Sequence, residues 1–184
     1  MMSVRSGVLA QELPRPLIDI GAKAPVFKLP DSSGEIHHLK EYLGRPVVLY
    51  FYPEDDTPTC TEQACAFRDA MPRLESSTAV VIGVNADAPD SHERFTRKFQ
   101  LPFSLLSDAL SRDGVPKIAD RYGVWRKKSM YGREFMGIAR TTYLIDEAGK
   151  VARRWDNVRV AGHVDEVLDA IHELRRGAAP LMAR

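Results

Sequence analysis

The stretch "PVVLYFYPEDDTPTC", residues 46–60, runs from an apolar segment to a cysteine, and the fold prediction is built on it. Its first seven residues are almost all apolar and rich in β-branched and aromatic side chains. This composition is typical of a strand that is buried on both faces of a sheet. Pro53 ends the strand, and the acidic residues after it make a turn that leads to Cys60. The sequence therefore predicts a central strand whose end delivers a cysteine to the start of a helix.

Two helix starts are compatible with this segment. Thr57 fits the N-cap position with Pro58 as the first helical residue, where the missing N–H of proline costs nothing. Thr59 fits the N-cap of a capping box that Glu62 closes three residues later. Both starts place Cys60 in the first helical turn. There the free N–H groups and the positive end of the helix dipole favour a thiolate, which is the nucleophilic form of cysteine.

Cys65 is the only other cysteine in the chain, five residues further along. In an intact helix the two Cα atoms lie ~8.6 Å apart, whereas a disulfide requires about 4.4–6.8 Å. A bond between them therefore requires the first turns to unwind. Our hypothesis is that Cys60 attacks a substrate and Cys65 resolves the product after local unfolding. The alternative for Cys65 is a small buried apolar side chain with no chemical role.

Strand and helix patterns alternate along the rest of the chain. The expected elements are a strand at 79–86, a helix at 90–99, a short helix ending at Gly123, a hairpin of "RTTYLID" and "KVARRWD" around residues 147–149, and an amphipathic helix at 163–176 that ends near Gly177. This order predicts an α/β fold with a central mixed sheet and helices on both faces, compatible with a thioredoxin-like fold. We expect one domain over residues 1–184, with an N-terminal arm at 1–19 and a C-terminal tail at 177–184.

The composition excludes several classes of protein. The chain has 184 residues, 44% of them hydrophobic and 28% charged, with a formal net charge of +1. These values fit a soluble globular protein and predict no nucleic-acid or membrane partner. The first residues show no sustained apolar core or cleavage site, so we expect no signal peptide and a cytoplasmic location. Two cysteines are too few for a disulfide scaffold.

The segment "VVLYFYPEDDTPTCTEQACAFRD" strongly resembles the peroxiredoxin Q subfamily, also called bacterioferritin comigratory protein. Members are thiol peroxidases with a thioredoxin-like fold. The resemblance extends from about residue 20 to 175 and includes "IGAKAPVFKLPDSSGE", "YGVWRKKSMYGREFMGIARTTYLIDEAGKV" and "VAGHVDEVLDAI". Several separated matches in the same order make it specific.

The resemblance implies a role for five residues. Cys60 would be the peroxidatic cysteine that becomes a sulfenic acid, and Cys65 matches the resolving position of many members. Pro53 would shield the thiolate from water, and Thr57 would hydrogen-bond the sulfur or the peroxide. Arg140 matches the active-site arginine, whose fixed charge would favour the thiolate and stabilise charge on the transferring oxygens. No metal, flavin or nucleotide cofactor is implied.

The resemblance also implies partners. The substrates would be hydrogen peroxide and small organic hydroperoxides, and thioredoxin or a glutaredoxin-like dithiol protein would reduce the disulfide. An intramolecular disulfide needs no second subunit, so we expect a monomer, with a weak homodimer as the alternative. One departure from the family pattern is Thr59, which stands where the familiar motif has glycine.

The two cysteines are also compatible with functions other than that of a peroxidase. The same two thiols would also serve a redox sensor or, with a histidine, a thiol-based metal chaperone. None of the five histidines lies at a ligand spacing from the cysteines, and we interpret His37 and His38 as solvated. We interpret Asp55 and Asp56 as a solvated turn rather than an acid/base pair.

A cluster of large apolar residues lies within the matched segment "YGVWRKKSMYGREFMGIARTTYLIDEAGKV". Its members are Trp125, Met130, Tyr131, Phe135 and Met136. Packing in the core or at its rim is the default expectation. The alternative hypothesis is that they border the peroxide site and favour bulkier hydroperoxides.

Overall fold

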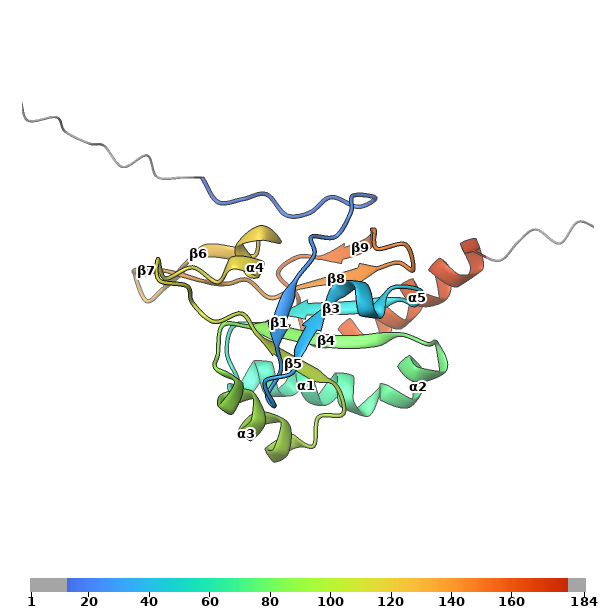
Figure 1. Cartoon of the computed structure of the whole chain (residues 1–184), viewed down its shortest axis with the longest axis horizontal. Coiled ribbons are helices and arrows are strands. Elements are labelled where there is room, and N and C mark those ends of the chain that lie inside the picture. The colour runs from blue at the N-terminus through green and yellow to red at the C-terminus, as the bar shows by residue number, and fades with distance from the viewer. Residues whose placement is uncertain (1–12, 179–184) are drawn as a thin grey trace, which may run out of the picture.

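A five-stranded mixed sheet forms the centre of the computed structural model, which describes residues 13–178 (Figure 1). Its strand order is β5-β4-β3-β8-β9, with β3, β4 and β5 parallel and β8 and β9 antiparallel to their neighbours. The strands are β3 (Val47–Phe51), β4 (Val80–Asn85), β5 (Ser104–Ser107), β8 (Thr141–Ile145) and β9 (Val151–Trp155). The predicted central strand is therefore confirmed as β3, with a partner on each side.

Alternate residues of β3 enter two different hydrophobic clusters, because successive side chains of a strand point to opposite faces. Val48 and Tyr50 belong to one cluster, and Leu49 and Phe51 belong to the other. All five residues of β3 are buried. This agrees with the prediction, made from the apolar run, of a strand that is covered on both faces.

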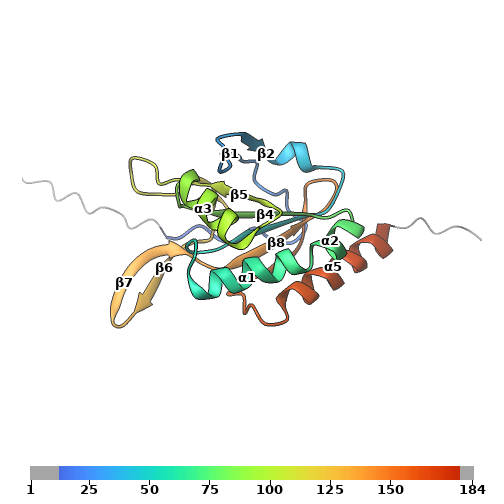
Figure 2. The ribbon, with the colours of Figure 1, turned by 90° about the horizontal axis from the view of Figure 1, so that it is seen from below.

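Helices cover most of one face, as Figure 2 shows for α1, α2 and α5. The helices are α1 (Pro58–Asp69), α2 (Met71–Ser76), α3 (Pro89–Phe99), α4 (Lys117–Arg121) and α5 (His163–Ala178). The opposite face packs against α4, a 3-10 helix η1 (Leu39–Tyr42) and a hairpin of β1 (Lys28–Pro30) and β2 (Ile36–His38). Helices thus lie on both faces, as predicted. Within residues 13–178, none of them is both long and apolar enough to cross a membrane.

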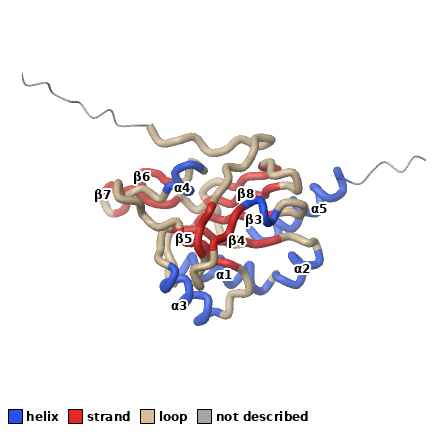
Figure 3. The backbone as a smooth tube through the Cα atoms, viewed as in Figure 1, coloured by secondary structure: helices blue, strands red, loops and turns tan. Residues whose placement is uncertain are grey.

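The chain between α4 and β8 forms a separate hairpin of β6 (Trp125–Met130) and β7 (Arg133–Ile138), visible beside the main sheet in Figure 3. The expectation that the apolar cluster here packs in the core or at its rim is wrong for Met130, Tyr131, Phe135 and Met136, which are exposed, Tyr131 by 96%. Within residues 13–178 the two strands pair only with each other, so most of the hairpin has no sheet there to pack against. Trp125, at its base, does pack against the core.

The described residues include part of the predicted N-terminal arm and the end of the last helix. Residues 13–19 of the predicted arm lie against the body: Arg15 pairs with Asp120 at 2.9 Å, and the Ile18 N–H donates to the Tyr143 hydroxyl at 3.3 Å. Helix α5 runs to Ala178, one residue beyond the predicted end. Residues 1–12 and 179–184 of the predicted arm and tail lie outside the described residues.

Candidate active site

One edge of the sheet gathers the ends of three strands. Strand β3 runs antiparallel to β8, and Phe51 at the end of β3 pairs with Thr141 at the start of β8. Strand β4 runs parallel to β3, so its end lies at the same edge. The loop that leads to Cys60 and the residue before β8, Arg140, are therefore brought together although 80 residues separate them.

Helix α1 begins at the first of the two predicted starts. Thr57 is the N-cap, with extended backbone (φ −86°, ψ 155°), and Pro58 is the first helical residue. The Thr57 carbonyl accepts the Thr61 N–H at 2.8 Å, and its hydroxyl donates to the Glu54 carbonyl at 3.2 Å. The alternative start at Thr59 is wrong. Thr59 lies inside the helix and is exposed.

Four residues of α1 form a buried stripe that faces the core: Cys60, Gln63, Ala64 and Phe67. Their spacing of three and four residues is that of one helix face. Cys60 is only 2% exposed. Cys65 is half-buried and, at five residues from Cys60, is rotated by ~140° around the axis. Both thiols are free, and the helix between them is continuous, as expected for the reduced protein.

The guanidinium of Arg140 joins Cys60 to Gln63. Its Nη2 lies 3.3 Å from the Cys60 Sγ, and its Nη1 donates to the Gln63 Oε1 at 2.6 Å. The Arg140 carbonyl accepts the Val158 N–H at 2.9 Å, which fixes the backbone as well. A planar guanidinium held at two points presents its positive charge to the sulfur in a fixed direction.

Two further ionisable side chains lie near the sulfur. Burial raises the pKa of Tyr50 well above its usual range, and the negative charges of Cys60 and Asp55 act in the same direction. Burial and the charge of Arg140 lower the pKa of Lys128, on β6, whereas Cys60 acts to raise it. The surroundings of the sulfur therefore include a neutral phenol and a lysine amine as well as the Arg140 guanidinium.

The profile of the AhpC/TSA family matches residues 20–154. The chain belongs to the AhpC/TSA family. It is 45% identical over 151 residues to a putative peroxiredoxin Bcp of Coxiella burnetii, which covers 82% of this chain and 97% of the relative. It is 42% identical over 157 residues to peroxiredoxin Bcp of Bacillus subtilis, covering 85% of this chain and 97% of that protein.

Solved structures of AhpC/TSA proteins show the same fold. A structure of Xanthomonas campestris bacterioferritin comigratory protein, described for its alkyl peroxide reduction activity, is 32% identical, covers 86% of this chain and 98% of its own, and has a TM-score of 0.74. The predicted thioredoxin-like fold and the resemblance to peroxiredoxin Q are therefore confirmed. Membership of this AhpC/TSA branch supports a thiol peroxidase activity.

The structure places the five residues that the family pattern singled out in two groups. Pro53, Thr57 and Cys60 follow β3 in one segment, and Arg140, the residue before β8, contacts Cys60. Pro53 and Thr57 are half-buried in the loop. Cys65 is the member that the fold does not bring to Arg140, because it lies off the buried stripe of α1.

Sequence reasoning missed several residues near the site. Gln63 lies three residues after Cys60, so the helical period alone was a usable signal for a shared face. Its Nε2 is buried without a partner within residues 13–178. Tyr50 is concealed in the apolar run of β3. Lys128 belongs to a basic run and gave no signal, because only the hairpin places it near Arg140.

The prediction of a solvated turn at Asp55 and Asp56 is correct for only one of them. Asp56 is exposed and pairs with Lys98 at 2.7 Å. Asp55 is buried, at 8% exposure, because polar groups from β4 and α3 surround its carboxylate. Those donors are distant in sequence, so the flanking residues gave no sign of the burial.

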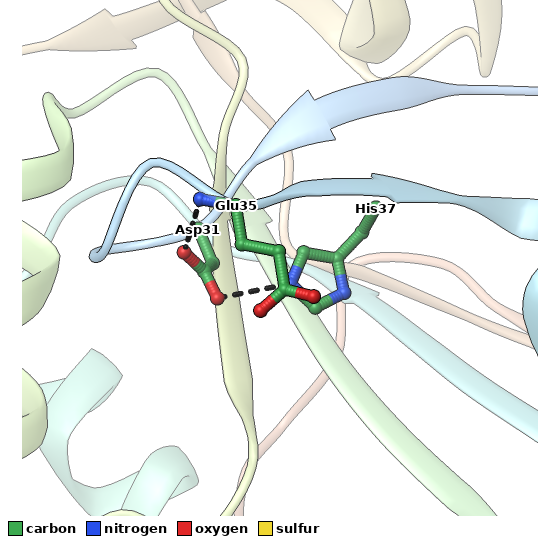
Figure 4. Close-up of side chains that lie close together, drawn as sticks. All are labelled: Asp31, Glu35 and His37. Atoms are coloured by element: carbon green, nitrogen blue, oxygen red, sulfur yellow. Dashed lines mark hydrogen bonds and ion pairs between the residues drawn. The ribbon is translucent and has the colours of Figure 1, made fainter.

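Figure 4 shows a second group of polar side chains, at the turn between β1 and β2. The Asp31 Oδ1 accepts the Ser33 N–H at 2.8 Å and the Glu35 N–H at 3.1 Å, and its Oδ2 lies 2.9 Å from the His37 Nε2. The other His37 nitrogen contacts the Tyr42 hydroxyl. The prediction that His37 is solvated is therefore wrong, because its side chain is half-buried. These hydrogen bonds give Asp31 and His37 a structural role, which is to hold the turn between β1 and β2 in place.

His163 is the first residue of α5, as the sequence predicted. It is buried, and its Nε2 lies 2.8 Å from the Thr142 Oγ1. Its ring meets that of Trp155 edge-on at 5.5 Å. Burial lowers the pKa of His163 to about 4, so the imidazole is neutral near neutral pH.

Proposed function

We propose that this protein reduces hydrogen peroxide and small organic hydroperoxides, with Cys60 as the nucleophile and Cys65 as the resolving thiol. The observation that carries the proposal is the contact of 3.3 Å between the Arg140 Nη2 and the Sγ of Cys60, which lies in the first helical turn and is itself buried. A guanidinium there stabilises negative charge on the sulfur before the reaction. It also stabilises the charge that moves to the peroxide oxygens during it.

The first step is a two-electron oxidation of the sulfur. The Cys60 thiolate attacks the distal oxygen of the peroxide, an S–O bond forms, and the O–O bond breaks. The leaving alkoxide or hydroxide takes a proton and departs as alcohol or water. Cys60 is left as a sulfenic acid. Gln63 acts as a positioning residue, because it holds Arg140 through Nη1 while Nη2 faces the sulfur.

Thr57 and Pro53 complete the surroundings of the peroxide. The Thr57 hydroxyl donates its hydrogen bond to the Glu54 carbonyl, so its oxygen can accept a hydrogen bond from the O–H of the peroxide. Pro53 has no N–H and follows the buried end of β3, and we assign it the shielding of the thiolate from water.

Cys65 enters in the second step. Its thiol attacks the Cys60 sulfenic sulfur, a disulfide forms, and water leaves. The continuous helix holds the two Cα atoms ~8.6 Å apart, beyond disulfide range, so this step requires the first turn of α1 to unwind. A dithiol protein such as thioredoxin then supplies two electrons and two protons and regenerates both thiols.

The test compares wild type, Cys60→Ser and Cys65→Ser, each fully reduced and mixed with one equivalent of hydrogen peroxide. We expect wild type to react rapidly and to form an intramolecular disulfide. We expect Cys65→Ser to react as fast but to stop at the sulfenic acid, and Cys60→Ser not to react. A wild-type rate no better than that of free cysteine would refute the activation of Cys60.

A second measurement separates the enzyme from a redox sensor. Steady turnover of peroxide with thioredoxin, thioredoxin reductase and NADPH supports the peroxidase. A single oxidation that thioredoxin and glutaredoxin both fail to reverse would support the sensor instead. Comparing hydrogen peroxide with cumene hydroperoxide in the same assay gives the substrate preference.

A further inference from the structure

Asp55 lies in the loop between β3 and α1, and its carboxylate is hydrogen-bonded from three directions. The Oδ1 accepts the Tyr52 hydroxyl at 2.6 Å and the Asn85 Nδ2 at 3.1 Å. The Oδ2 accepts the Ser91 hydroxyl at 2.8 Å and lies 2.7 Å from the His92 Nδ1. Tyr52 follows β3, Asn85 ends β4, and Ser91 and His92 belong to α3. A single carboxylate thus joins the loop to three other parts of the fold.

The backbone of the same loop is also held. The Asp55 N–H donates to the Asp87 Oδ2 at 2.8 Å, in the turn between β4 and α3. Asp56 adopts a left-handed conformation (φ 54°) and pairs with Lys98 on α3. The hydroxyl of the next residue, Thr57, donates to the Glu54 carbonyl. The chain is therefore continuously anchored up to the N-cap of α1.

The Asp55–His92 contact is the most buried part of this arrangement. The side chains are 3% and 0% exposed. Burial acts to raise the pKa of Asp55, but the hydrogen bond and charge of His92, with hydrogen bonds from Tyr52 and Ser91, outweigh it and lower the pKa. An ionised carboxylate only accepts, so the His92 Nδ1 donates. A buried charge with these partners is strongly held, and removing one partner is costly.

None of these contacts touches Cys60, so their role is positional. We propose that Asp55 and His92 form a clamp that fixes the loop before α1 and thereby sets how readily the turn that carries Cys60 unwinds. The clamp keeps Pro53 and Thr57 in place for the first step. It also confines unwinding to the residues after Asp56, which slows the approach of Cys60 to Cys65. This inference rests on the proposed disulfide between the two cysteines.

Two fates of the Cys60 sulfenic acid report on the unwinding. If the turn opens, the Cys65 thiol attacks the sulfur, and a disulfide and water form. If the turn stays closed, a second peroxide transfers one oxygen to the sulfenate, and a sulfinic acid and the corresponding alcohol or water form. A looser clamp therefore shifts the products toward the disulfide and slows the first step.

The experiment uses Asp55→Asn and Ser91→Ala, with Asp90→Asn as a matched control. The substitution Asp90→Asn also replaces an aspartate with an asparagine, but Asp90, on α3, faces solvent and pairs with Arg94. Ser91→Ala removes one hydrogen bond, leaves the charge in place, and serves if Asp55→Asn does not fold. The protein is titrated with hydrogen peroxide, and the disulfide and sulfinic forms are quantified by mass spectrometry. The rate of the first step is measured separately.

For Asp55→Asn, we expect the ratio of disulfide to sulfinic acid to rise by at least about tenfold, the factor for losing hydrogen bonds to a charged group. The first step should slow at the same time. For Ser91→Ala, a rise of about tenfold is expected, because the one hydrogen bond that it loses is also to the charged carboxylate. Asp90→Asn should match wild type. A folded Asp55→Asn or Ser91→Ala with the wild-type ratio would overturn the clamp.

Hydrogen exchange of the amides in residues 57–62 of the reduced proteins makes the test independent of the disulfide. We expect faster exchange in Asp55→Asn and Ser91→Ala than in Asp90→Asn. If wild type forms no Cys60–Cys65 bond, the resolving step of the proposed function fails. The exchange rates then decide the clamp alone, and unchanged protection in both clamp variants would refute it.

Discussion

Replacing Arg140 with methionine removes the charge beside Cys60 and keeps a side chain of similar length. The Nη2–Sγ contact of 3.3 Å joins a half-buried Arg140 to a buried Cys60, so water screens it less than a contact on the open surface. A hydrogen bond to a charged group contributes about 1.5–3 kcal/mol. Each 1.36 kcal/mol of barrier is tenfold in rate, so we expect the first step to slow by about 10- to 150-fold.

The assay is stopped-flow mixing of reduced protein with hydrogen peroxide, followed by tryptophan fluorescence or by competition with a second peroxidase. Arg153→Met is the control, because Arg153 lies on the neighbouring strand β9 and its half-exposed side chain pairs with Glu173. Arg140→Lys should be intermediate, because one ammonium cannot face both Gln63 and the sulfur. A rate for Arg140→Met within about twofold of wild type would refute the assigned role, since it is below the smallest expected effect.

Three further predictions concern the positioning of Arg140 and the stability of the fold. Gln63→Leu should slow the first step by about two- to tenfold, since one hydrogen bond to Arg140 is lost, while Arg140→Met/Gln63→Leu should be no slower than Arg140→Met alone. Burial lowers the pKa of His163 from 6.5 to about 4, so the unfolded chain takes up a proton first as the pH falls. The free energy of unfolding should therefore fall by up to roughly 3 kcal/mol between pH 6.5 and pH 4. Urea unfolding at several pH values should show this decrease, and His163→Asn should make the free energy of unfolding less dependent on pH over that range. Gly83→Ala should lower the free energy of unfolding by about 1–3 kcal/mol, because a Cβ would lie 2.7 Å from a Leu105 side-chain atom, and an unchanged urea midpoint would contradict this close packing.

The parts of the fold that were predicted correctly are those with strong local patterns. The continuous apolar run of β3 and the amphipathic stripe of α5 each report their burial directly in the sequence. The hairpin of β6 and β7 was missed, because a basic run interrupts the alternation and its apolar residues resemble a core segment. Strands β1, β2 and β5 have only three or four residues, too short for a period to show.

The candidate site divides in the same way. The sequence by itself determined that α1 begins near Thr57 and that Cys60 lies in its first turn, because capping and proline preference act over a few neighbouring residues. Only the tertiary structure decided that Arg140 contacts Cys60 and that Asp55 is buried against His92. Those partners arrive on other strands and helices, 80 and 37 residues away. Their positions depend on how the sheet pairs and how the helices pack, and not on the neighbours of either residue.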